Sequence, residues 1–202
     1  MNQILKGISF VFHPLIMPLL GVIFYFSKTP RFIPSEIIQA KLLSTFILTV
    51  VLPILIYFLL KTLGKVHSIY LRTVSERILP LGLNSVVIYL ILKRVFTSGE
   101  IIELYFFFIG ILLSNLACFI LAILKFKASI HMIAISGFLM FCVALSIRFS
   151  ININGTLALL ILITGAIASS RIHLKAHNNK ELFVGLCVGL IPQLLLMNFW
   201  IG

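Results

Sequence analysis

Three polar side chains near the C-terminus combine the parts of a phosphoryl-transfer site. His177 and Glu181 are four residues apart, so on a helix they would share one face and the carboxylate could orient the imidazole. Arg171 precedes them, and its guanidinium presents a fork of donors that matches phosphate. A histidine nucleophile, a carboxylate that orients it and a cation that binds the anion are the parts of covalent phosphoryl transfer. The stretch lies between two apolar segments, where charged groups facing hydrocarbon are costly.

The composition indicates a membrane protein. Of the 202 residues, 61% are hydrophobic and only 10% are charged, and the mean hydropathy is +1.20. A soluble domain of this size has too little interior to bury so much apolar surface. The net charge is +11, with five Glu and no Asp, but without a basic run or a basic domain nucleic acid is excluded as a partner. The three cysteines lie inside apolar runs and indicate packing rather than disulfides or metal binding.

Apolar segments along the chain predict an all-α fold: a single integral membrane domain over residues 1–202, with six to seven membrane-spanning helices. Each of the seven apolar segments has about the 17–25 residues that a bilayer crossing requires, although the sixth segment is short. The first lacks a small-residue cleavage site, so it is expected to be a spanning helix rather than a signal peptide. Prolines within the segments are expected to kink or start helices. The segments cover residues 8–26, 41–60, 78–96, 101–124, 130–149, 155–170 and 182–201.

Alternation of the crossings predicts that three polar loops share one side. These are the loops after the second, fourth and sixth segments, and four of the five histidines and nine of the sixteen Lys and Arg lie in or next to them. A shared site accounts for this clustering better than random scatter does. The loops are Lys61–Arg77, Lys125–Ser129 and Ser170–Glu181.

The polar residues of these loops follow an ordered set of three motifs. The third loop reads Ser170-Arg171, five residues, His177, three residues and Glu181, and the second reads Ala128-Ser129-Ile130-His131. Over roughly residues 65–190 the chain therefore resembles the phosphatidic acid phosphatase type 2 superfamily of membrane lipid phosphatases. The family pattern is Lys-x6-Arg-Pro, then Pro-Ser-Gly-His, then Ser-Arg-x5-His-x3-Asp.

The resemblance has departures in every motif. In the third, Glu181 replaces Asp and keeps the carboxylate. In the second, Ile130 replaces a Gly. Glycine has no side chain and lets backbone amides approach phosphate closely, so the Ile130 side chain is expected to hinder that approach. In the first, Arg77 matches the family Arg, but the Lys position falls on Tyr70, with Lys65 and Arg72 nearby.

The resemblance implies a role for each matched residue. His177 would attack phosphorus, Glu181 would hold its tautomer, and His131 would protonate the leaving alcohol and then activate water. It further implies hydrolysis of membrane lipid or polyprenyl phosphates without a metal or other cofactor, and weakly suggests a bacterial inner membrane. The residues expected to bind the phosphate oxygens are Arg171, Arg77, Ser129 and Arg72.

Other interpretations of these residues and of the chain remain open. Ser129 could act only as a helix N-cap, and Glu181 as a carboxylate favoured at a helix N-terminus. A degenerate relative that binds anionic lipid without catalysis is the second hypothesis. A transporter is the third, disfavoured because polar residues in mid-segment are few and mild. Ten Lys and Arg lie on the motif side and six on the other side, and an excess of positive charge places the motif side in the cytoplasm. Without the expected phosphate ligands Arg72, Arg77 and Arg171 the count is seven against six, which leaves the orientation open.

Overall fold

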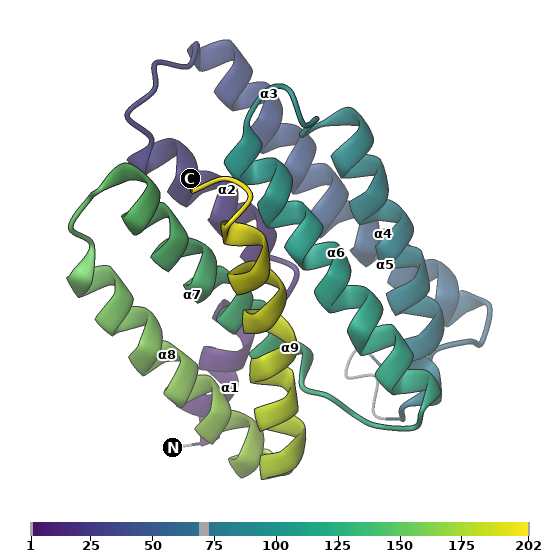
Figure 1. Cartoon of the computed structure of the whole chain (residues 1–202). Helices are drawn as coiled ribbons and strands as arrows, with labels where there is room; N and C mark the ends of the chain where they lie inside the picture. Colours follow the sequence, from purple (N-terminus) through teal and green to yellow (C-terminus); the bar gives the residue numbers. More distant parts are fainter. Residues whose placement is uncertain (1, 69–72, 202) are drawn as a thin grey trace.

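The computed structural model describes residues 2–68 and 73–201, and this part of the chain consists of helices and connecting loops without strands. Six helices are long and apolar enough to cross a membrane. The prediction of an all-α polytopic membrane bundle is therefore confirmed (Figure 1). The long helices are the continuous run α3–η1–α4 over Ser35–Thr62, α5 (Ser75–Arg94), α6 (Ile102–Ile123), α7 (Ile130–Phe149), α8 (Asn154–His173) and α9 (Asn179–Met197).

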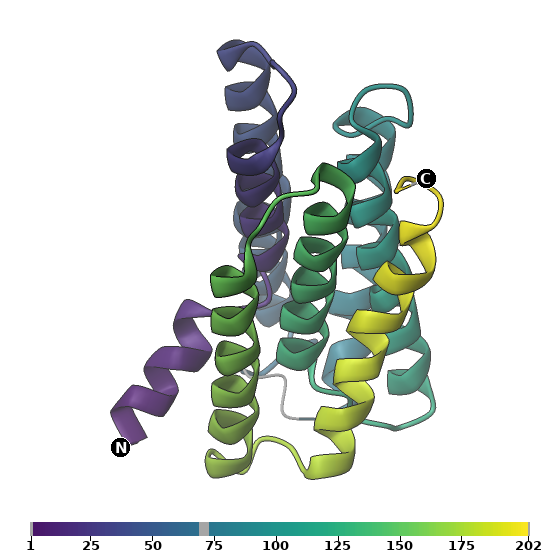
Figure 2. The same ribbon diagram turned by 60° about the vertical axis from the view of Figure 1, so that its left-hand side comes forward.

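The first apolar segment forms two short helices, α1 (Asn2–Val11) and α2 (Met17–Lys28), so the prediction of one spanning helix over 8–26 was wrong. Pro14 has no N–H to donate, and the next amide, Leu15 N, is bonded to His13 Nδ1 at 3.3 Å instead. At its twelve residues, α2 is about 18 Å long, which is shorter than the bilayer core. Figure 2 shows α1 leaving the bundle at an angle.

A proline also changes the helix geometry within the first long span. The five residues Ile47–Val51 form a π-helical turn, η1, between α3 (Ser35–Phe46) and α4 (Leu52–Thr62). Pro53, the second residue of α4, cannot donate a backbone hydrogen bond, so the wider turn accommodates the missing donor. The irregularity falls where the sequence predicted a proline effect.

Helix α7 is the most buried of the long helices, and α9 lies against it along its length. Two glycines one turn apart on α9 make this contact close. A Cβ on Gly189 would lie 2.1 Å from Ile133 O, and one on Gly185 would lie 2.7 Å from Ser129 O. Only glycine lets the two backbones approach so closely. This packing sets the start of α9 beside the start of α7.

Polar residues in mid-segment join neighbouring helices. Asn84 Nδ2 on α5 donates to Asn115 Oδ1 on α6 at 3.2 Å, and Asn115 Nδ2 donates to Leu81 O at 2.8 Å. Ser114 Oγ donates to Val188 O on α9 at 2.9 Å. Such bonds hold helices together in an apolar environment, where an unsatisfied polar group is costly. These residues therefore act as contacts between helices.

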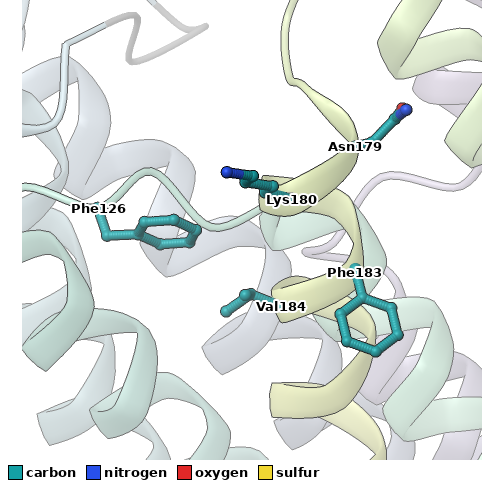
Figure 3. A pocket seen from close by; sticks show the side chains of 5 residues that line it. All are labelled: Phe126, Asn179, Lys180, Phe183 and Val184. Carbon is teal, nitrogen blue, oxygen red and sulfur yellow. The ribbon is translucent and has the colours of Figure 1, made fainter.

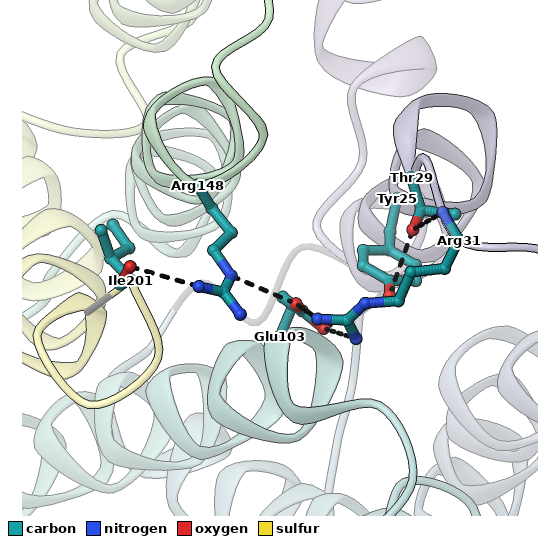
Figure 4. A network of polar contacts seen from close by, with 6 residues as sticks. All are labelled: Tyr25, Thr29, Arg31, Glu103, Arg148 and Ile201. Atoms are coloured by element: carbon teal, nitrogen blue, oxygen red, sulfur yellow. Dashed lines mark hydrogen bonds and ion pairs between the residues drawn. The ribbon is translucent and has the colours of Figure 1, made fainter.

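A buried carboxylate ties together the end of the bundle opposite the motif loops (Figure 4). Glu103, at the start of α6, is fully buried and accepts two hydrogen bonds from Arg31 at 3.1 and 2.7 Å. Tyr25 donates to the same carboxylate at 3.3 Å. Arg148 Nε lies 3.7 Å from it, and Arg148 Nη1 donates to Ile201 O. The cluster connects the α2–α3 loop, α6, α7 and the last turn of the chain.

The three motif loops lie at one end of the bundle, as the alternation of crossings predicted. Figures 1 and 2 show the α6–α7 and α8–α9 connections and the described parts of the α4–α5 connection together at the lower end, with the C-terminus and the α2–α3, α5–α6 and α7–α8 loops at the other. We call the lower end, which contains residues 63–68, 73–77, 124–131 and 171–181, the motif end. The fold thus brings separate parts of the sequence to one place.

Candidate functional site

The start of α9 holds the histidine and the carboxylate of the third motif. Helix α9 begins at Asn179, so His177 lies just before it rather than on its face. Asn178 caps the helix by accepting from Glu181 N at 2.9 Å, and Glu181 Oε2 accepts from Asn178 N at 3.3 Å. The same carboxylate oxygen lies 2.7 Å from His177 Nδ1. The predicted pair is present, although a capping box rather than a helical turn produces it.

This pairing determines which nitrogen of His177 can react. A carboxylate accepts, so Nδ1 carries the proton and Nε2 keeps the lone pair of the neutral ring. The side chain is only 2% exposed. Burial lowers the pKa of His177 to about 4, and nearby Arg77 and Arg171 act in the same direction, while Glu181 opposes them. His177 is therefore neutral at physiological pH, which is the state that a nucleophile requires.

Ser129 joins the second motif to the third. Its backbone N donates to Glu181 O at 3.1 Å, which fixes the two loops together. Its hydroxyl accepts from Met132 N at 3.5 Å as the N-cap of α7, and the residue is fully buried. The N-cap interpretation of Ser129 therefore holds in this structure. Its predicted contact with phosphate stays a prediction.

His131, one residue into α7, faces the N-terminal part of the chain. Its Nε2 lies 3.2 Å from Ser9 O, so it donates to that carbonyl. The ring of His13 meets it edge-on, with 5.6 Å between centroids. His131 is also close enough to Arg171 and His177 to interact with them electrostatically. No motif in the sequence linked His13 to His131, so this contact was not predicted.

The two arginines reach the site from different helices. Arg77, in the first turn of α5, is buried rather than at the surface, and its Nη1 donates to Ala128 O at 2.9 Å. Arg171 lies in the last turn of α8 and acts electrostatically on His177. Two residues of the first-motif comparison, Tyr70 and Arg72, lie outside the described residues.

Ile130 is used in packing at the start of α7. Its side chain packs against an apolar cluster that includes Leu81 of α5, Ala122 of α6 and Ala128. Its size therefore fills space between helices. The hindrance expected from the sequence at this position stays a prediction.

Two pockets flank the first turn of α9. A polar pocket of about 450 Å³ opens beside His177 and is lined by Lys127, Ile172, Lys175, Ala176, His177, Asn178 and Glu181. An apolar pocket of about 430 Å³ borders the same turn and is lined by Phe126, Asn179, Lys180, Phe183 and Val184 (Figure 3). A polar and an apolar pocket side by side suit a molecule with a charged head and a hydrocarbon tail.

Sequence reasoning did not include Lys127 among the site residues. It lines the polar pocket, and its Nζ donates to Ala176 O at 3.2 Å, next to His177. A signal was present, because Lys127 precedes Ser129 of the second motif by two residues. The lysine of the family pattern belongs to the first motif, so the pattern pointed to that loop instead.

Comparison with protein-family models, with characterised proteins and with solved structures finds no significant match. The chemistry available at the motif end is therefore argued from its geometry. A neutral, oriented histidine lies among the cationic side chains of Arg77, Arg171 and Lys127, with Glu181 as the carboxylate at its side. This arrangement suits nucleophilic attack on the phosphorus of an anionic phosphate group, whose oxygens the cations would stabilise.

Proposed function

We propose that this chain is an integral membrane phosphatase that hydrolyses lipid or isoprenyl phosphates or diphosphates through a phosphohistidine at His177. The observation that carries the proposal is the buried His177–Glu181 pair, which lies among cations from α5, α8 and the α6–α7 loop. Six apolar helices support a substrate that is itself in the bilayer. By the same resemblance that suggests the reaction, we place the protein in a bacterial inner membrane.

The proposed reaction has two steps. His177 Nε2 attacks phosphorus and forms the N–P bond as the P–O bond to the leaving group breaks. The imidazolium form of His131 delivers its Nδ1 proton to the leaving oxygen, while its Nε2–H keeps the bond to Ser9 O. His131 then takes a proton from water, which attacks phosphorus and breaks the N–P bond. Arg77 and Arg171 stabilise the charge on the equatorial oxygens in both steps.

Phosphate release from purified protein tests the proposal. Phosphatidic acid, a polyprenyl monophosphate and a polyprenyl diphosphate are supplied in detergent micelles, and inorganic phosphate is measured. We expect turnover of at least one of them, and loss of turnover with a folded protein in His177→Ala. His173→Ala is the matched control, because this histidine is exposed on the last turn of α8 and lines neither pocket.

Trapping of the phosphoenzyme separates the roles of the two histidines. With a substrate whose leaving group is good, His131→Ala should still form labelled phosphoenzyme, because acid assistance matters least there. His177→Ala should form none. Near-normal turnover of lipid phosphate by His177→Ala would refute the covalent mechanism.

A lipid-binding protein without catalysis is the second candidate. It is favoured by the engagement of Ser129 as an N-cap, by the Tyr70 that replaces the family lysine and by the Ile130 that replaces glycine. If no lipid or polyprenyl ester releases phosphate while the protein binds vesicles that contain phosphatidic acid, this second candidate replaces the first.

A further inference from the structure

The cation that the first motif lacks has a replacement elsewhere in the fold. The family lysine position falls on Tyr70, and the described lysine nearest to it in sequence, Lys65, is exposed. Lys127 belongs to a different loop, yet it is half-buried and lines the polar pocket beside His177 and Glu181. A phosphate that enters this pocket therefore meets Lys127 together with the proposed nucleophile.

Hydrogen bonds of the two residues that follow Lys127 hold this part of the loop in position. Two residues later, Ser129 N is bonded to Glu181 O, and Ala128 O accepts from Arg77. The ammonium itself donates to Ala176 O at 3.2 Å. An ammonium has three donors, so a bond to one carbonyl is compatible with further bonds to phosphate oxygens. The loop thus fixes a cation next to the residue that precedes His177.

The surroundings of Lys127 are those of an anion site. Burial lowers the pKa of Lys127, and the positive charges of Arg77 and Arg171 lower it further, while Glu181 opposes them. Like charges brought together in a partly buried place repel one another unless an anion joins them. A phosphate group with two negative charges would compensate this excess.

We propose that Lys127 is a substrate-binding residue that holds the phosphate in the polar pocket and takes the place of the missing first-motif lysine. This inference rests on the proposed function and deepens it, because it assigns the pocket to the phosphate head of the substrate. The hydrocarbon chain would then extend into the neighbouring membrane.

Kinetics of paired lysine variants test the assignment. Lys127→Gln should raise KM for the lipid phosphate about tenfold with a smaller change in kcat, because this charge binds ground and transition states alike. Lys127→Arg should restore KM to within a few-fold. Lys125→Gln is the control, since it removes the same charge from the same loop, but Lys125 is exposed and does not line the pocket. Equal KM values for the two Gln variants would overturn the proposal.

A second measurement uses the wild-type chain and does not depend on the folding of a variant. The purified protein is treated with an amine-acylating reagent, and modification at each lysine is followed by mass spectrometry. Orthovanadate, a phosphate analogue, should slow modification of Lys127 several-fold and leave Lys125 unaffected. Turnover of lipid phosphate without protection of Lys127 would overturn this inference alone. Protection without turnover would support the anion site and refute the proposed hydrolysis instead.

Discussion

Glu181 illustrates how one side chain can serve both folding and chemistry. Its backbone N and its carboxylate complete the capping box with Asn178, and the carboxylate also accepts from His177. The two interpretations considered for Glu181 in the sequence, a helix-start carboxylate and an orienting group, are thus compatible in one geometry. The extra methylene relative to the family Asp is accommodated because the carboxylate reaches back over the helix start.

The charge of Glu181 can be separated from its capping role. Gln also forms a capping box, so Glu181→Gln should fold. It should lower kcat on the order of 10²–10⁴-fold, because the neutral amide stabilises the charge that develops on His177 less well. Glu181 raises the pKa of His177, so its loss should move that pKa still lower than about 4 and keep the ring neutral.

The activity lost in Glu181→Gln should therefore not return on raising the pH. The acid limb of the wild-type pH–rate profile, set by protonation of His177, should lie near pH 4, well below the ordinary 6.5 of histidine. Nitrogen NMR of histidine-labelled protein, with His177→Asn to assign the signal, measures the pKa directly. A His177 pKa near 6.5, or recovery of the variant at alkaline pH, would contradict this account.

At the scale of elements, the contact between α7 and α9 builds the site. Gly185 and Gly189 allow the close approach that sets Ser129 against Glu181. The effect extends along the helices, because a Cβ on Gly189 would meet the backbone oxygen of Ile133. Backbone atoms cannot move aside as the end of a flexible side chain can, so a methyl group here must separate the helices.

Two glycine-to-alanine changes test this contact. Gly189→Ala should lower the thermal unfolding midpoint by several degrees and reduce the proposed phosphatase activity, because it moves the start of α9 away from that of α7. Gly165→Ala, in α8, is the control, since nothing lies within 4 Å of the added Cβ. It should leave stability unchanged or slightly higher, as alanine favours helix. Thermal scans in detergent measure the unfolding midpoints of both variants. An unchanged midpoint in Gly189→Ala would show that this contact does not limit the stability of the protein.

At the scale of the whole molecule, the two ends of the bundle differ in how they use charge. At the far end, the fully buried Glu103 is satisfied by Arg31, Arg148 and Tyr25, so that cluster is structural. At the motif end, cations gather around a histidine, with Glu181 as the carboxylate beside it. The first end locks loops and the C-terminal turn together, and the second presents charge to a pocket.

Cysteine labelling tests the sidedness of the two ends. In a background without Cys118, Cys142 and Cys187, single cysteines at Lys65, Lys125 and Lys175 should react with an impermeant thiol reagent from the same side of the membrane. Cysteines at Ser98 and Asn152, in exposed loops of the far end, should react from the opposite side. Labelling of any motif-end position together with the far-end positions would refute the shared site.

The sequence alone indicated that the chain is a helical membrane protein, and it indicated which loops lie together at one end of the bundle. Apolar runs of bilayer length predict spanning helices because hydrocarbon requires every backbone polar group to be satisfied within the segment. Alternation of the runs then places the loops with Arg77, Ser129 and His177 at one end. Both predictions use properties that can be counted along the chain. They hold in the structure although the first segment forms two short helices separated near Pro14.

Only the tertiary structure decided which side chains meet at that end. The helix break brings Ser9 and His13 to His131, and the glycine contact of α9 with α7 brings Glu181 to Ser129. The same packing places Lys127 beside His177, although its loop belongs to another motif. Contacts of this kind depend on the separation and rotation of whole helices, which are set by packing between distant residues and leave no local periodic signal in the sequence.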